Sequence, residues 1–217
     1  MAEKLNVAII DYEMGNVKSI ENAITHIGDF NVVITADSSV ILSSDIIILP
    51  GVGAFPDAMK KLSEKGLISV LEKAVKELKK PTIGICLGMQ LLFDVSEEKE
   101  ITKGLGWIPG KVTYMHPEGN LRVPHIGWNS LILQPADIIF DYLNTDKDFY
   151  FVHSLHVVCD DQYTMAKFDY GGLMTAAVRK DNVVGMQFHP EKSQKNGLLA
   201  LSSFFKWASS MVGQHNA

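Results

Sequence analysis

The stretch TIGICLGMQLLF, residues 82–93, constrains the fold more than any other part of the chain. Its β-branched start predicts a buried strand, and the apolar residues after Gly88 predict the first turns of a helix. A strand that turns sharply into a helix around Cys86 is the geometry of a nucleophile elbow, and glycines at positions 84 and 88 suit the crowding of such a turn. The helix N-terminus would favour a thiolate over a thiol. Because a lone cysteine is more often a buried structural residue, this motif by itself supports both readings about equally.

The first half of the chain alternates short apolar segments with segments of helical periodicity. Strands are predicted at residues 5–10, 31–34, 46–49 and 82–85, and helices at 17–27 and 67–78. This alternation predicts an α/β fold, a three-layer sandwich around a mostly parallel central sheet. In such sheets the functional groups gather at the carboxyl ends of the strands, which is where loops 11–16 and 50–55 and Cys86 fall.

The second half is richer in short extended segments with β-branched and aromatic residues. Strands are predicted at 111–115, 129–133, 149–153, 163–168, 175–179 and 183–187, and a closing helix at 197–211. We interpret most of these strands as antiparallel additions to the parallel core. No internal repeat or convincing linker interrupts the sequence, so a single domain is predicted for residues 1–217.

Composition argues against several functional classes. The net charge is −5 and no block of Lys and Arg occurs, so nucleic-acid binding is not expected. The first apolar run ends at Asp11, unlike a signal peptide, and no apolar run is long enough to span a membrane. The two cysteines, Cys86 and Cys159, make no disulfide framework, which favours a reducing compartment. We therefore expect a cytoplasmic protein that does not bind membranes.

A candidate partner for Cys86 lies far along the chain, in the segment QFHPE at residues 187–191. His189 and Glu191 are two residues apart after a predicted strand, so their side chains are expected to point the same way. The carboxylate would then orient the imidazole, and the imidazole would take the proton of the thiol. Only the fold can bring this pair to the cysteine.

The other histidines offer less. His153 and His156 form an H-x-x-H pair on a predicted strand or its end, where their side chains would point in opposite directions. They have no acidic neighbour, so no metal site is predicted. The remaining histidines have no partner that the sequence reveals: His26, His116, His125 and His215.

An oxyanion formed at Cys86 needs hydrogen-bond donors. The glycine-rich segment PGVG at residues 50–53 follows the third predicted strand and can aim a backbone N–H at the site. The amide of Leu87, at the start of the elbow helix, is a second donor. An ordinary tight turn would explain the same glycines, and spacing alone does not separate the two interpretations.

Together, the segments GICLGMQLLF, PGVGAF and QFHPEKS resemble the class I, triad-type glutamine amidotransferases, which have a flavodoxin-like sandwich. Five further segments closely resemble the glutaminase subunits of imidazole glycerol phosphate synthases: DYEMGNVKSI, GLGWIPGKV, PHIGWN, FYFVHS and HPEKSQ. These matches run in order from about residue 11 to residue 194, so the resemblance covers nearly the whole chain.

The resemblance implies a Cys-His-Glu triad. Cys86 would attack the side-chain amide of glutamine and form a thioester, His189 would act as base and then as acid, and Glu191 would orient His189. Val52 and Leu87 would offer the oxyanion N–H groups, with Gly53 giving the loop freedom to turn. The residues implied at the amino-acid end of the substrate are Gln90 and Glu98, with the backbone around His153, Ser154 and Leu155.

The resemblance also implies a partner and no cofactor. In the family, ammonia passes into a (β/α)8-barrel cyclase subunit, which forms imidazole glycerol phosphate and an aminoimidazole carboxamide ribotide in histidine biosynthesis. Residues implied on the face toward that barrel are Asn16, Trp128, Asn129 and Lys192. Glutaminase turnover is expected to wait for a loaded cyclase, through an oxyanion strand that turns its N–H into place on signal.

Two residues depart from the family pattern. Glu13 stands where a small residue, often glycine, is usual, and Leu155 stands where an aromatic residue is common. These departures leave open a related subunit that supplies ammonia to another synthase, such as one that amidates a surface sugar. A stand-alone cysteine hydrolase and a non-catalytic module of the same fold are further alternatives, although the intact Cys86, His189 and Glu191 argue against the latter.

Overall fold

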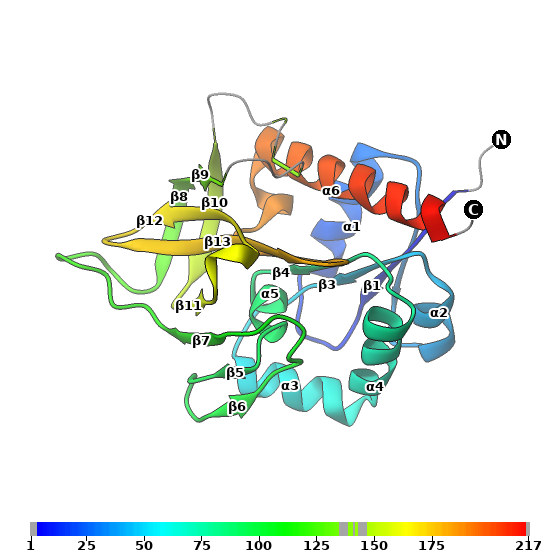
Figure 1. Ribbon diagram of the computed structural model, residues 1–217, viewed down its shortest axis with the longest axis horizontal. Helices are drawn as coiled ribbons and strands as arrows, with labels where there is room; N and C mark the ends of the chain where they lie inside the picture. Colours follow the sequence, from blue (N-terminus) through cyan, green and yellow to red (C-terminus); the bar gives the residue numbers. More distant parts are fainter. Residues whose placement is uncertain (1–3, 135–138, 141, 143–146, 216–217) are drawn as a thin grey trace.

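The protein is described here by a computed structural model, which covers residues 4–134, 139–140, 142 and 147–215. Within these residues an eight-stranded sheet in the order β2-β1-β3-β4-β14-β13-β12-β9 forms the centre of the molecule (Figure 1). Its parallel strands are β1 (Asn6–Ile10), β2 (Asn31–Thr35), β3 (Ile46–Leu49), β4 (Thr82–Ile85) and β14 (Val183–Met186). Every residue of β3 and β4 is buried, as expected for strands covered on both faces.

Helices cover both faces of this sheet (Figure 1). One face carries α1 (Val17–Ile27) and α6 (Gln194–His215). The other carries α2 (Ser38–Ser43), α3 (Phe55–Glu64), α4 (Leu67–Glu72), which continues into the π-helical turn η1 (Lys73–Glu77), and α5 (Leu87–Leu91). The residues of β1 alternate between the two resulting cores, with Val7 and Ile9 in one and Ala8 and Ile10 in the other. The predicted three-layer α/β sandwich is confirmed.

Most strands of the second half are antiparallel additions, as predicted; the exceptions are β14, which belongs to the parallel core, and β5, which pairs with β7 in parallel. In the main sheet β12 (Thr164–Asp169) pairs with β13 (Leu173–Lys180) and with β9 (Ile132–Leu133). A two-stranded sheet joins β8 (His125–Ser130) to β10 (Asp148–His153), and a four-stranded sheet contains β5 (Val95–Ser96), β6 (Thr102–Lys103), β7 (Lys111–Tyr114) and β11 (Leu155–Val158). Two short 3-10 helices complete the second half, η2 (Asp161–Tyr163) and η3 (Pro190–Lys192).

Some elements differ from the prediction. The sequence pattern does not predict α2 and α3, and it predicts a single strand at 129–133 where the structure has β8 and β9. In α3 the buried Phe55, Ala58, Met59 and Leu62 do follow a helical spacing, and a proline opens the helix. This helical spacing is not evident in the sequence because its first residue, Phe55, is also the last residue of the glycine-rich segment PGVGAF, which predicts a loop. No helix in the described part of the chain is long and apolar enough to cross a membrane.

The elbow between β4 and α5 is tightly packed against its neighbours. Cys86 has φ 55 and ψ −112, a backbone conformation that is uncommon for a residue with a side chain. A Cβ atom at Gly88 would lie 1.9 Å from the carbonyl oxygen of Leu49 in β3. The elbow helix therefore packs against the neighbouring strand with no space for a methyl group.

Gly88→Ala is expected to destabilise the protein by about 3 kcal/mol, because the contact it creates is with sheet backbone that cannot rotate away. Gly213→Ala is the matched control, since a Cβ there meets nothing within 4 Å. In the helix α6 that change is expected to add roughly 0.5–1 kcal/mol of stability. Urea unfolding of both variants measures the difference. A Gly88→Ala variant as stable as the wild type would contradict the close approach of elbow and strand.

Candidate active site

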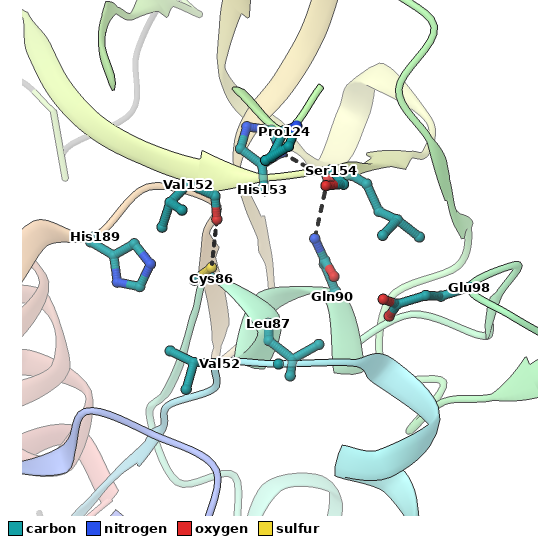
Figure 2. Close-up of a pocket in the computed structure, with 12 residues that line it drawn as sticks. Val52, Cys86, Leu87, Gln90, Glu98, Pro124, Val152, His153, Ser154 and His189 are labelled. Atoms are coloured by element: carbon teal, nitrogen blue, oxygen red, sulfur yellow. Dashed lines mark hydrogen bonds between the residues drawn. The ribbon is translucent and has the colours of Figure 1, made fainter. Parts of the chain in front are cut away.

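A cavity of about 270 Å³ opens beside the elbow, at the carboxyl ends of the parallel strands (Figure 2). Its lining comes from the PGVG loop, the elbow, the loop after β5, the residue before β8, the end of β10 with the turn into β11, and the segment after β14. The lining residues are Val52, Gly53, Cys86, Leu87, Gln90, Glu98, Pro124, Val152, His153, Ser154, Leu155 and His189. All the predicted catalytic, oxyanion and substrate-binding residues except Glu191 therefore meet at one cavity.

Cys86 is placed at the cavity by the elbow and is 6% exposed. Its sulfur lies 3.9 Å from the carbonyl oxygen of Val152, to which a thiol can donate. The side-chain nitrogen of Gln187 also lies 3.9 Å from the sulfur, as a donor. The nucleophile candidate thus faces the cavity and polar groups, and is not enclosed by apolar side chains alone.

The pair His189 and Glu191 follows β14. The Nδ1 atom of His189 lies 2.8 Å from Oε1 of Glu191, and the two side chains are 2% and 1% exposed. The buried Nε2 atom of His189 has no hydrogen-bond partner in the described part of the chain, and the ring lies on the Cys86 side of the cavity (Figure 2). The predicted pairing is present, although Glu191 belongs to the 3-10 helix η3 and not to an extended segment.

The imidazole of His189 is held in its protonated form. Burial lowers the pKa of His189, but the neighbouring sulfur of Cys86 and the hydrogen-bonded carboxylate of Glu191 outweigh it and raise that pKa to about 10. A protonated imidazole at this position can give its proton to a leaving group at the cavity. Since the pKa of an unfolded histidine is about 6.5, the interaction with Cys86 and Glu191 stabilises the fold fully below that pH and is lost as pH rises toward about 10.

In the PGVG loop one of the two predicted oxyanion donors is bonded elsewhere, which is compatible with the predicted strand that turns its N–H into place on signal. The amide of Val52 donates to the carbonyl oxygen of Met14 at 3.2 Å, so it is engaged outside the cavity. The loop is tied down on its other side, where the buried hydroxyl of Tyr12 donates to the carbonyl oxygen of Pro50 at 2.6 Å. Leu87 is the first residue of α5, so its N–H has no acceptor within the helix. Only one of the two predicted donors is therefore available in this conformation.

The predicted substrate residues line the far end of the cavity. Gln90 donates from Nε2 to the carbonyl oxygen of Leu155 at 3.3 Å (Figure 2). The carboxylate of Glu98 accepts from the backbone N–H of Phe55 at 2.6 Å, which places its charge at the N-terminus of α3. Leu155 is buried and forms cavity wall, so the departure from an aromatic residue changes the shape of the pocket. The binding roles of these residues stay predictions.

The structure pairs His125, for which the sequence revealed no partner, with His153. Strands β8 and β10 place the two residues opposite each other, with Nδ1 of His125 3.3 Å from Nε2 of His153. The other nitrogen of His153 donates to the carbonyl oxygen of Leu155 at 2.7 Å. Burial lowers the pKa of His153 to about 4, so this ring is neutral and holds the cavity wall in place. Finding the pair from sequence would have required the register of β8 against β10.

No group of three or more metal-ligating side chains is found in the described ranges, and neither His153 nor His156 belongs to one. No metal site is proposed.

The four residues predicted on the partner face differ in their exposure and in their contacts within the chain. Trp128 is 48% exposed and lines a hollow with residues 193–196, directly after the exposed Lys192. Asn16 begins α1, which packs against η3 next to Lys192. The side chain of Asn129, in contrast, donates to the carbonyl oxygen of Asp169 and accepts from the N–H of Ser130. Asn129 thus has a structural role within the strand, and its predicted partner contact stays untested.

The unusual Glu13 has a structural explanation. Its φ angle is 69, in the left-handed region where glycine is favoured. Its carboxylate forms ion pairs with Lys61 of α3 and with Lys65, the residue directly after α3. Hydrogen bonding to these lysines lowers the pKa of Glu13 to about 2. The extra charge is thereby paired within the chain itself.

Comparison with known proteins agrees with this site. A family model described as "Glutamine amidotransferase class-I" matches residues 8–206. The chain belongs to this family. Among curated relatives, it is 62% identical to imidazole glycerol phosphate synthase subunit HisH 2 of Vibrio vulnificus, over 94% of this chain and 95% of that protein. It is 43% identical to subunit HisH 1 of Campylobacter jejuni, over 91% and 98% of the two chains. The predicted resemblance to these subunits is confirmed.

A solved structure of a glutamine amidotransferase superposes with a TM-score of 0.69, at 18% identity, over 95% of this chain and 98% of that chain. At this identity the likeness concerns the fold alone. It supports the class I amidotransferase architecture that the motifs predict, with a mostly parallel sheet followed by antiparallel strands.

Proposed function

We propose that this class-I glutamine amidotransferase is the glutaminase subunit of an imidazole glycerol phosphate synthase. The observation that carries the proposal is the convergence of Cys86 with the buried His189–Glu191 pair at a cavity that also holds Gln90 and Glu98. The 62% identity to a subunit of that name over nearly the whole chain supports the choice of synthase.

The geometry supports a two-step hydrolysis of glutamine. The thiolate of Cys86 attacks the side-chain amide carbon, and the carbonyl electrons move onto the oxygen. When the tetrahedral intermediate collapses, the C–N bond breaks and His189 gives its proton to the nitrogen, releasing ammonia and a thioester. His189 then takes a proton from water, the hydroxide attacks the thioester, and the C–S bond breaks to return the thiolate and glutamate. Glu191 stabilises the imidazolium in each step.

The released ammonia explains the need for a second subunit. Ammonia in water near neutral pH is mostly protonated and not nucleophilic, so it must reach its acceptor by a dry route. We propose a (β/α)8-barrel cyclase as the partner, docked on the face formed by Trp128, the start of α1 and η3. Trp128 is half exposed there, and large exposed aromatic residues are frequent anchors of interfaces.

The test is to mix the purified chain with the barrel cyclase and measure both assembly and chemistry. A one-to-one complex that makes imidazole glycerol phosphate from glutamine is expected. Trp128→Ala should weaken the complex at least about tenfold if this residue anchors the interface. Val33→Ala is the control, because Val33 is similarly exposed but lies on β2, an edge strand of the main sheet that contributes no residue to the proposed face. Absence of a complex, or assembly with another synthase only, would reject this partner.

A further inference from the structure

We infer that Gln187 is a further catalytic residue: its side-chain amide donates an N–H to the sulfur of Cys86, in an orientation fixed by Gln90. The inference rests on the proposed glutaminase function. Gln187 is fully buried, directly after β14, and two residues before His189. None of the motifs considered above gives this residue a role.

Two contacts hold the amide of Gln187. Its Nε2 atom lies 3.9 Å from the sulfur of Cys86, within reach of an N–H···S bond. Its Oε1 atom accepts from Nε2 of Gln90 at 3.0 Å. The backbone is fixed as well, since the N–H of Gln187 donates to the carbonyl oxygen of Ala176 in β13 at 2.8 Å. The side chain therefore spans from the cavity residue Gln90 to the nucleophile.

The donor end of this amide must face the sulfur. Gln90 donates to the carbonyl oxygen of Leu155, which is only an acceptor, so the nitrogen of Gln90 is identified by that bond. The same nitrogen of Gln90 also donates to the side chain of Gln187, so the atom of Gln187 that accepts this bond must be its oxygen. Turning Gln187 around would place two NH₂ groups against each other in a buried site, which is costly. The chain of bonds thus runs from Gln90 through Gln187 to Cys86.

An N–H donor at the sulfur serves both halves of the reaction. Before the attack, this donor favours the thiolate over the thiol. It contacts the sulfur from the buried side, whereas the imidazolium of His189 lies at the cavity wall. In the second half the C–S bond breaks and its electron pair returns to sulfur, so the same donor stabilises the leaving thiolate. The link to Gln90 also ties the position of the nucleophile to a residue at the predicted substrate end of the cavity.

The test uses alkylation of Cys86 by iodoacetamide across the pH range, in the isolated subunit, with the Cys86 and Cys159 peptides distinguished by mass spectrometry. Gln187→Met keeps the length of the side chain but lacks the donor. Because hydrogen bonds to charged groups are among the stronger ones, alkylation below the pH midpoint is expected to slow about tenfold, with an unchanged plateau at high pH. The midpoint itself moves to higher pH, because the thiolate loses a donor.

Asn182→Ala is the matched control. Asn182 is another buried amide just before β14, and it donates to the carbonyl oxygens of Val75 and Lys80, away from the cavity. Its loss should lower the melting temperature without moving the alkylation midpoint. A wild-type profile in Gln187→Met, or an equal shift in Asn182→Ala, would overturn the inference.

Gln187→Glu covers the case in which the methionine variant does not fold. It keeps the shape of the side chain and removes the N–H donor, and an ionised carboxylate would also repel a thiolate, so the midpoint should move upward by more than in Gln187→Met; an unmoved midpoint counts against the role. Alkylation needs neither glutamine turnover nor a partner. A failure of this test therefore removes the role of Gln187 alone, whereas a failure to assemble with the cyclase removes the proposed synthase and leaves this result standing.

Discussion

Cys86→Ala is expected to abolish glutamine-dependent synthesis by the complex with the cyclase, with a loss of at least about 10³-fold. His189 and Glu191 cannot replace the sulfur, because they are already engaged with each other and neither can form the thioester. Synthesis from added ammonia should continue at the wild-type rate, since Cys86 is buried in the cavity and the outer surface is unchanged. The two assays are run on the same preparation.

Cys159→Ala is the control for this experiment. Cys159 is the second free cysteine, and its sulfur lies 3.8 Å from the hydroxyl of Thr164, away from the cavity lining. Burial raises the pKa of the Cys159 thiol, which makes it a poor nucleophile at neutral pH. This variant should keep both activities. Glutamine-dependent synthesis that survives in Cys86→Ala would show that the nucleophile lies elsewhere.

The elements that sequence reasoning located well are those with an undisturbed pattern. The strand β3 reads as four apolar residues and is buried throughout, and the helix α1 begins and ends where its periodicity does. The elbow was recognisable for a different reason, since few backbones need glycine on both sides of one reactive residue. In each case a local rule and the tertiary structure agree.

The features that sequence reasoning missed depend on contacts between distant segments. Nothing local to His125 indicates His153, because the pairing follows from the register of β8 on β10. Gln187 was visible within QFHPE, but its bonds reach 101 residues back to Cys86 and 97 back to Gln90. The sequence does predict a movable oxyanion N–H, but its present acceptor, the carbonyl oxygen of Met14, depends on the orientation of one peptide plane, which residue type does not determine. A sequence motif cannot predict such contacts, because they join residues from segments that are distant in the chain.

The isolated subunit is expected to hydrolyse glutamine about 10²–10³-fold more slowly than the complex with ligand-loaded cyclase, because that is the cost of one missing oxyanion donor. Here the N–H of Val52 is bonded to Met14 and turned from the cavity. Gly53, with φ +104, gives the loop a residue that tolerates more than one conformation. A partner that stabilises the turned peptide would supply the donor and raise turnover, and the assay compares rates with and without the loaded cyclase.

Val52→Pro tests whether that N–H is the group that is gated. Proline has no N–H, so the loaded complex should fall to the rate of the isolated subunit, while alkylation of Cys86 persists because the nucleophile is untouched. Val52→Ala loses the side chain but keeps the N–H, and the difference between the two variants measures the donor itself. The side chain of Val52 is 41% exposed, so neither change disturbs the core. Full glutamine turnover by the isolated subunit would show that the N–H of Val52 does not control the rate. Full activation of Val52→Pro by the loaded cyclase would show that the second oxyanion donor is another residue.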